Sequence, residues 1–230
     1  MGDSRVNPQT FLPWAKARPL IKTGDVLALR DTGCVARMIK MAGRSLHSHV
    51  EVAYWVQDSL ETVGFCEFAG GRSIAFETYV EKFPCRWDVF RLSDAVELKW
   101  FSDGVARQHI MSTRREAMAQ ILRKMTGQRY GWWSLWWAAC RHLTPGLVPA
   151  VVNDDDTLRY PPFCSQAIAM ACREAHRTIV DGQSITVDLV RWLPDWLTEP
   201  ADLVRSPLLH YLFSICPDSE ETADAIPDHD

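Results

Sequence analysis

The 230-residue sequence has no excess of basic residues, no CxxC pair and no uninterrupted apolar run of membrane-spanning length. Lys and Arg number 25 against 29 Asp and Glu, which argues against a broad nucleic-acid surface, because such a surface needs clustered cations. The most apolar stretch, residues 132–152, is interrupted by Arg141, His142, Pro145 and Pro149, whereas a spanning helix needs about twenty nearly continuous apolar residues. We therefore expect no nucleic-acid partner and no membrane span.

The cysteine pattern argues against a disulfide framework or a structural zinc site. The seven cysteines are odd in number and show no paired spacing, so reduced thiols in a reducing compartment are the expectation. The first twenty residues are polar, with Pro8, Pro13 and Pro19, and contain no apolar signal segment. We expect a cytoplasmic protein, although a phage-encoded or non-classically exported enzyme would show the same pattern.

The chain contains no internal repeat and no low-complexity linker, and its length suits one domain with decorations. Hydrophobic residues make up 47% and charged residues 23%, a globular composition. We divide the chain into an N-terminal arm (1–23), one domain (24–214) and an acidic flexible tail (215–230).

The first half of the domain has strand-like patterning, and the second half is helical. Runs rich in β-branched and aromatic residues predict strands at 26–30, 49–56, 60–69, 73–77 and 87–92, with Gly70-Gly71 as a turn. Apolar residues at helical spacing predict helices at 34–42, 112–125, 132–143 and 164–175. Strands followed by helices indicate an α+β domain with a small antiparallel sheet.

Cys164 is the candidate nucleophile. It follows Pro161 and Pro162, which cannot continue a helix, so it lies at the first turn of the next helix. There the free N–H groups and the helix dipole favour a thiolate. The alternative is a buried cysteine that packs as a small hydrophobic residue, which is the commoner role for cysteine.

A thiol nucleophile needs a base and a group that orients the base. His49 opens a predicted strand after a polar loop and is the best-placed base; His47 has the same strand parity and competes with it. Glu67, on the neighbouring predicted strand, is the candidate orienting residue, because a carboxylate in so apolar a strand needs a partner. Glu51 and Glu77 are competitors for that role.

The order of several motifs resembles a known superfamily. The sequence runs from GDVLALR (24–30) through SHVEVAYWV (48–56), FCEFAGG (65–71) and TGQRYGW (126–132) to FCSQAIAMA (163–171), followed by Pro200-Ala201-Asp202-Leu203 and Ser206-Pro207. This resembles the permuted, YiiX-like branch of the NlpC/P60 superfamily of papain-like thiol hydrolases. In that branch the histidine strand precedes the cysteine helix. The resemblance covers roughly residues 24–213.

The resemblance implies a papain-like core in which the sheet packs on the nucleophile helix. It implies Cys164 as nucleophile, His49 as base and Glu67 as the orienting residue, with Tyr130 near the nucleophile. Ser165, next to the nucleophile, and Glu51 are placed with Tyr130 among the oxyanion or substrate-binding residues. Glu51 stands where the family has Gly, so it either orients His49 or crowds the site, and Gln166 stands where Glu is usual.

Two further patterns each have a structural and a functional interpretation. Trp132, Trp133, Trp136 and Trp137 form one aromatic helix face, which we interpret as core or a lid; the alternatives are a substrate groove or a lipid contact. Asp154–Asp156 are consecutive, without the alternating spacing of a cation site, and are interpreted as a solvated loop.

We expect a thiol amidase or peptidase that needs no metal or organic cofactor. Its substrate would be a peptide, a peptidoglycan stem peptide or an N-acyl compound, cleaved through a thioester. The alternatives are a lipid acyltransferase or thioesterase, which the Trp face favours, and a catalytically silent papain-like binding module. The substrate, the partners and the oligomeric state do not follow from the sequence.

Overall fold

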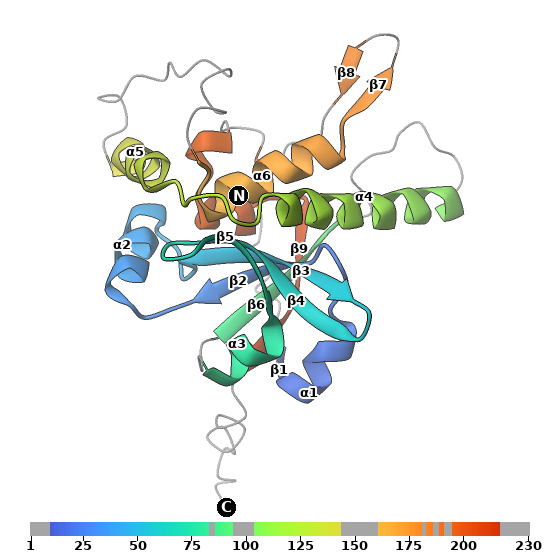
Figure 1. Cartoon of the computed structure of the whole chain (residues 1–230), viewed down its shortest axis with the longest axis horizontal. Helices are drawn as coiled ribbons and strands as arrows, with labels where there is room; N and C mark the ends of the chain where they lie inside the picture. Colours follow the sequence, from blue (N-terminus) through green and yellow to red (C-terminus); the bar gives the residue numbers. More distant parts are fainter. Residues whose placement is uncertain are drawn as a thin grey trace, which may run out of the picture.

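A computed structural model describes residues 10–82, 86–93, 104–143, 161–180, 183–185, 189–190 and 195–216. These residues form an α+β fold in which one large sheet lies between two unequal helical layers (Figure 1). The α+β class is therefore as expected. The sheet is larger than predicted, with seven strands, and it is mixed rather than purely antiparallel.

The seven strands lie in the order β1-β9-β6-β2-β3-β4-β5. Neighbouring strands are antiparallel except β1 and β9, which pair in parallel between the two ends of the described chain. The strand bounds are β1 Phe11–Pro13, β2 Val26–Arg30, β3 His49–Val56, β4 Ser59–Cys66, β5 Gly70–Ala75, β6 Arg86–Leu92 and β9 Leu209–Cys216.

The helices connect and cover these strands. Their bounds are α1 Trp14–Ala17, α2 Cys34–Gly43, α3 Phe76–Lys82, α4 Gly104–Lys124, α5 Trp132–Leu143, α6 Cys164–Ala175 and α7 Pro200–Val204, with short 3-10 helices η1 Arg18–Leu20 and η3 Asp195–Leu197. A separate hairpin, β7 (Thr178–Val180) and β8 (Gln183–Ile185), follows α6.

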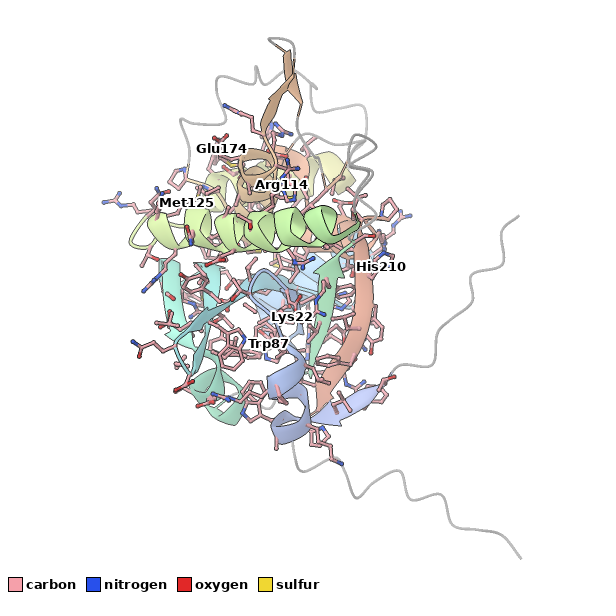
Figure 2. The ribbon with its side chains drawn as sticks, turned by 90° about the vertical axis from the view of Figure 1, so that its right-hand side faces the viewer. Lys22, Trp87, Arg114, Met125, Glu174 and His210 are labelled. Atoms are coloured by element: carbon pink, nitrogen blue, oxygen red, sulfur yellow. The ribbon has the colours of Figure 1, made fainter. Side chains whose placement is uncertain are left out.

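The two faces of the sheet are buried in separate hydrophobic clusters because side chains alternate along each strand. Val26 and Val50 share one cluster with Ile168 of α6, on the side that α4 and α6 cover. Leu27 and Trp87 belong to the other cluster, with residues of α1 and α3. Figure 2 shows α4 on one side of the strands and Trp87 on the other, near α1. The cluster beneath α6 is the one that contains Cys164.

Several predicted elements are confirmed to the residue: the strands at 26–30 and 49–56 and the helices at 132–143 and 164–175. The prediction is wrong around residues 67–77. Gly70 and Gly71 are the first residues of β5 and do not form a turn. Strand β4 ends at Cys66, and β5 ends at Ala75, directly before α3 begins at Phe76. Both glycines approach the backbone after α4 closely: a Cβ at Gly70 would lie 2.1 Å from the carbonyl oxygen of Gln128.

The described part of the segment expected as an arm lies against the sheet. Phe11–Pro13 pairs with β9, and Ala17 and Ile21 are buried. At the other end, β9 continues to Cys216, two residues beyond the expected domain boundary at 214. The sheet therefore extends at one edge through strands that the sequence patterning did not predict.

Candidate active site

Cys164 is the first residue of α6, as the two preceding prolines predict. Phe163 precedes it in an extended conformation (φ −96°, ψ 177°), so the helix begins abruptly at the cysteine. Only 1% of Cys164 is exposed. Its backbone N–H belongs to the first turn of the helix, where the N–H groups have no acceptor within the helix. The thiol is thus held beside a backbone donor of the kind that stabilises an oxyanion.

A close backbone approach brings Tyr130 to the nucleophile. The N–H of Gly131 donates to the carbonyl of Pro162 at 3.1 Å. A Cβ at Gly131 would lie 1.9 Å from the carbonyl oxygen of Pro161, so this approach requires glycine. Burial raises the pKa of Tyr130 well above 10, and the charges of the nearby Cys164 and Glu67 raise it further. Tyr130 therefore lies beside Cys164 as a neutral phenol.

His49 opens β3 and is 4% exposed. Its Nε2 lies 3.2 Å from Oε1 of Glu51, while its Nδ1 has no fully formed hydrogen bond to any described residue. Burial lowers the pKa of His49, but hydrogen bonds and charges from Cys164 and Glu51 outweigh burial and raise it well above 6.5. The imidazole is therefore flanked by the thiol and a carboxylate, with Nδ1 available to the thiol.

Glu51 is fully buried, two residues along the same strand, so its side chain is on the same side of β3 as that of His49. The neighbouring strand makes room for it with Gly64, where a Cβ would lie 3.0 Å from Cγ of Glu51. Arg72 of β5 lies opposite Gly64 of β4, and its Nη2 donates a hydrogen bond to Oε1 of Glu51 at 2.9 Å. Burial would raise the pKa of Glu51, but His49 and Arg72 lower it to about 2. Glu51 is thus an anion at neutral pH.

Arg72 is itself held by Tyr79 of α3. Its Nη2 donates to the Tyr79 hydroxyl at 2.7 Å, and its guanidinium lies 4.9 Å from the centre of the Tyr79 ring. A continuous buried chain therefore runs from Cys164 through His49 and Glu51 to Arg72. The contact of Arg72 with Glu51 could not be predicted from the sequence, because it depends on a strand register that side-chain alternation alone does not define.

Glu67, the expected orienting residue, does not contact His49. Strand β4 ends one residue earlier, at Cys66, so Glu67 lies in the β4–β5 turn. Its carboxylate is 3.6 Å from Sγ of Cys66, and its charge acts on Tyr130. Glu77, the other competitor, lies on α3 and pairs with Arg18. Glu51, rather than Glu67, is therefore the carboxylate that contacts His49.

His47 belongs to a separate buried cluster. Its Nε2 lies 2.6 Å from Asp88, which also pairs with Arg30 and accepts a hydrogen bond from Ser214. Burial opposes ionisation of Asp88, but hydrogen bonds from His47, Ser214 and Arg30 hold its pKa below its usual value. His47 is therefore engaged away from Cys164, and His49 is the histidine that faces the thiol.

The residues after Cys164 are buried and polar. Ser165 is 0% and Gln166 1% exposed, and neither Oγ of Ser165 nor Oε1 of Gln166 has a hydrogen-bond partner in the described part of the chain. The Tyr130 hydroxyl and Nδ1 of His49 share this property. Unpaired polar atoms are costly in a protein interior and concentrate where a site receives water or a ligand. This concentration around Cys164 fits a reaction centre.

The Trp face is more exposed than the interpretation as core predicts. Trp132, Trp133 and Trp136 are 44%, 60% and 57% exposed, so that interpretation is wrong for these three. Trp137 is partly buried against the core and stacks on Trp133. Helix α5, which carries them, lies beside α2 (Figure 1).

The remaining predictions concern metals, thiols and membranes. Within the described ranges no group of three or more His, Cys, Asp or Glu side chains is arranged to hold a metal ion. Asp154–Asp156 and Cys85 lie outside those ranges. The six described cysteines are free thiols. No described helix combines the length and the apolarity that crossing a membrane requires.

Comparison with known proteins leaves the family open. No family model matches the sequence, and no curated protein matches it either. Among solved structures, the metalloprotein YiiX from Escherichia coli O157:H7 is similar at a TM-score of 0.44 and 13% sequence identity. That alignment covers 86% of this chain and 99% of YiiX. The likeness is too distant to assign a family, and the NlpC/P60 resemblance stays a prediction.

The low pKa of Glu51 predicts a specific loss of stability in acid. Because the folded pKa, about 2, is below the ordinary value of 4.5, ionised Glu51 stabilises the fold fully above pH 4.5, and that contribution is lost as the pH falls toward 2. Urea unfolding at pH 5, 4 and 3 should show a smaller pH dependence in Glu51→Gln, which has no group to titrate there. Equal pH dependence in both proteins would contradict the assigned ionisation.

Proposed function

We propose that the protein is a cysteine hydrolase that cleaves an amide bond through a thioester on Cys164, on a permuted papain-like core. The observation that carries the proposal is the buried sequence of thiol, imidazole and carboxylate formed by Cys164, His49 and Glu51. A thiol nucleophile, a base beside it and an anion hydrogen-bonded to the base are the parts that acyl transfer by a thiol requires. The substrate classes are those expected from the sequence: a peptide, a peptidoglycan stem peptide or an N-acyl compound.

In the proposed reaction each group has one step. Because Nε2 of His49 faces Glu51, Nδ1 takes the proton of the Cys164 thiol and holds it as an imidazolium, and the resulting thiolate attacks the carbonyl carbon. The carbonyl oxygen becomes an oxyanion, and the N–H of Cys164 and the Tyr130 hydroxyl are its donors. Nδ1 then protonates the departing amine as the C–N bond breaks, which leaves a thioester.

The second half of the reaction regenerates the enzyme. Water attacks the thioester carbonyl and gives a proton to Nδ1 of His49, a second oxyanion forms and collapses, and the C–S bond breaks to release the acid. Through both halves the Glu51 carboxylate, held by Arg72, keeps the ring oriented and stabilises the imidazolium.

Trapping of the acyl-enzyme tests the proposal. The protein is incubated with activated acyl esters and amides, quenched in acid and digested, and its cysteine peptides are weighed by mass spectrometry. We expect the acyl mass on Cys164 and none in His49→Ala. Cys172→Ala is the matched control, since Cys172 is buried two turns further along the same helix, and it should still be acylated at Cys164. Equal acylation of wild type and His49→Ala, or no adduct on Cys164 with any reagent, would favour a catalytically silent binding module.

A further inference from the structure

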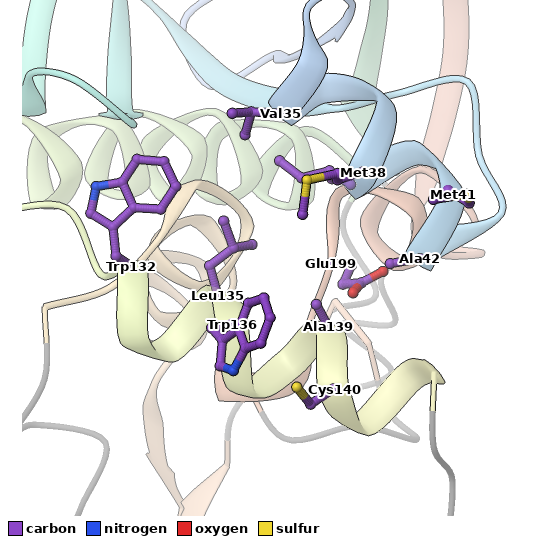
Figure 3. A pocket seen from close by; sticks show the side chains of 11 residues that line it. Val35, Met38, Met41, Ala42, Trp132, Leu135, Trp136, Ala139, Cys140 and Glu199 are labelled. Atoms are coloured by element: carbon purple, nitrogen blue, oxygen red, sulfur yellow. The ribbon is translucent and has the colours of Figure 1, made fainter.

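An apolar slot of about 210 Å³ lies between α2 and α5 (Figure 3). From α2 it is lined by Val35, Ile39 and Ala42 at successive turns, along with two methionines. Glu199 supplies the one ionisable carboxylate of the lining, and its side chain caps the N-terminus of α7. The slot is therefore built to exclude polar groups along most of its length.

The opposite wall repeats the same spacing. Trp132, Leu135, Trp136 and Ala139 of α5 line it at successive turns. The lining runs from Val35 to Ala42 on α2 and from Trp132 to Cys140 on α5. At the 1.5 Å rise of an α-helix these stretches are about 10 to 12 Å long. Figure 3 shows Val35 and Trp132 toward one end and the other labelled residues of the two helices extending away from it. A slot lined along this length has room for an extended, unbranched chain.

One end of the slot adjoins the candidate active site. The ring of Trp132 packs edge-to-face on Tyr130 with the ring centres 5.2 Å apart. Tyr130 in turn interacts with Cys164. Val35 packs against the hydrophobic cluster that contains Cys164. A molecule lying in the slot with one end at Trp132 would thus point that end toward the nucleophile.

We infer that this slot binds the unbranched acyl chain of the substrate, with the scissile carbonyl at the Trp132 end beside Cys164. The inference rests on the proposed function and narrows its substrate class to N-acyl compounds with a medium-length chain. An extended chain lengthens by about 1.3 Å per C–C bond, so about 10 Å accommodates about eight bonds. Burial of methylene groups against the aromatic and aliphatic walls supplies the binding free energy.

A chain-length series measures this directly. N-acylglycines with chains of two to twelve carbons are offered to the enzyme, and kcat/KM is measured for each. We expect kcat/KM to rise about two- to fourfold per methylene up to eight to ten carbons and then to level off. A flat series, or one that favours the acetyl compound, would overturn the inference.

Two tryptophans provide a matched pair of variants. Trp136 lines the slot, whereas Trp133, equally exposed on the same helix, does not. Trp136→Ala should lower kcat/KM for the eight-carbon substrate about tenfold relative to that for the acetyl compound. Trp133→Ala should leave the chain-length dependence of kcat/KM unchanged. Ala139→Leu, which narrows the slot, should move the optimum to shorter chains. Equal effects of Trp133→Ala and Trp136→Ala would overturn the inference, because the indoles would then act only as a general apolar surface.

Binding separates this inference from the proposed hydrolysis. Calorimetry on Cys164→Ser with N-decanoylglycine and N-acetylglycine does not depend on turnover. We expect the decanoyl compound to bind at least tenfold more tightly, and Trp136→Ala in the same background to remove the difference. Selective binding without acylation of the wild type would reject the hydrolase but keep the slot, and acylation without chain selectivity would reject the slot alone.

Discussion

Replacement of Cys164 by Ala should abolish turnover while leaving the fold intact. Loss of the nucleophile removes the covalent path, and in hydrolases of this kind such a loss lowers kcat by about 10⁴–10⁶-fold. The thiol is buried at the start of α6, and the substitution replaces only its SH group with hydrogen, which leaves the His49–Glu51 pair in place. The change should therefore cost about 1 kcal/mol of stability or less.

The measurement combines steady-state kinetics on an N-acyl substrate with thermal unfolding of the same samples. Cys66→Ala is the matched control, since Cys66 is also a buried free thiol close to Tyr130 but does not lie at a helix start. It should retain most of the activity. Activity that survives in Cys164→Ala would show that the acyl transfer does not proceed through this thiol.

The elements whose bounds were predicted correctly to the residue are those for which several local sequence signals agree. In α6, Pro161 and Pro162 define the start and the spacing of small apolar residues defines the buried face. In β3, β-branched and aromatic residues alternate up to the tight turn before β4. Signals of this kind are local, and no knowledge of the partner strand is needed to use them.

The elements that were missed depend on distant partners. β1 is only three residues long and exists because it pairs with β9, about two hundred residues away in the sequence. Gly70 and Gly71 look like a turn until the backbone after α4 is placed against them, where close approach rather than reversal explains them. Tertiary contacts override local propensity in both cases.

The same distinction between local signals and distant contacts applies to the residues of the candidate site. Cys164 and His49 follow from helix-start and strand-start positions, which are local. The choice between Glu51 and Glu67 depended on where β4 ends, and the Arg72 contact depended on the register of β4 with β5. A one-residue change of register would turn every side chain of a strand to the opposite face. Sequence patterning therefore predicted the candidate nucleophile and base and left the charged residues beside them open.

Glu51→Gln should produce the clearest change in mechanism. The amide keeps the shape of the side chain but removes the anion that stabilises protonated His49, so kcat should fall about 10³–10⁴-fold. The charge and hydrogen bond of Glu51 are among the causes that raise the pKa of His49. The alkaline limb of kcat/KM, where imidazolium is lost, should therefore move to lower pH in the variant.

The same substitution should also weaken the fold, because Arg72 then keeps a mostly buried charge without its carboxylate. Removal of one member of a buried ion pair costs about 3–5 kcal/mol, and a lower value is expected because the Arg72 side chain is 17% exposed. Urea unfolding at pH 7 measures this loss, and single-turnover kinetics below the unfolding transition keep the two effects separate.

Glu67→Gln is the matched comparison that decides between the two carboxylates. Glu67 lies in a turn and contacts Cys66, so its loss should change the free energy of unfolding by no more than about 0.5 kcal/mol and leave the alkaline limb in place. If Glu67→Gln moves that limb and Glu51→Gln does not, the orienting role belongs to Glu67. The buried Glu51–Arg72 pair would then stabilise the sheet without acting on the base, and Gly64 would be required only for packing.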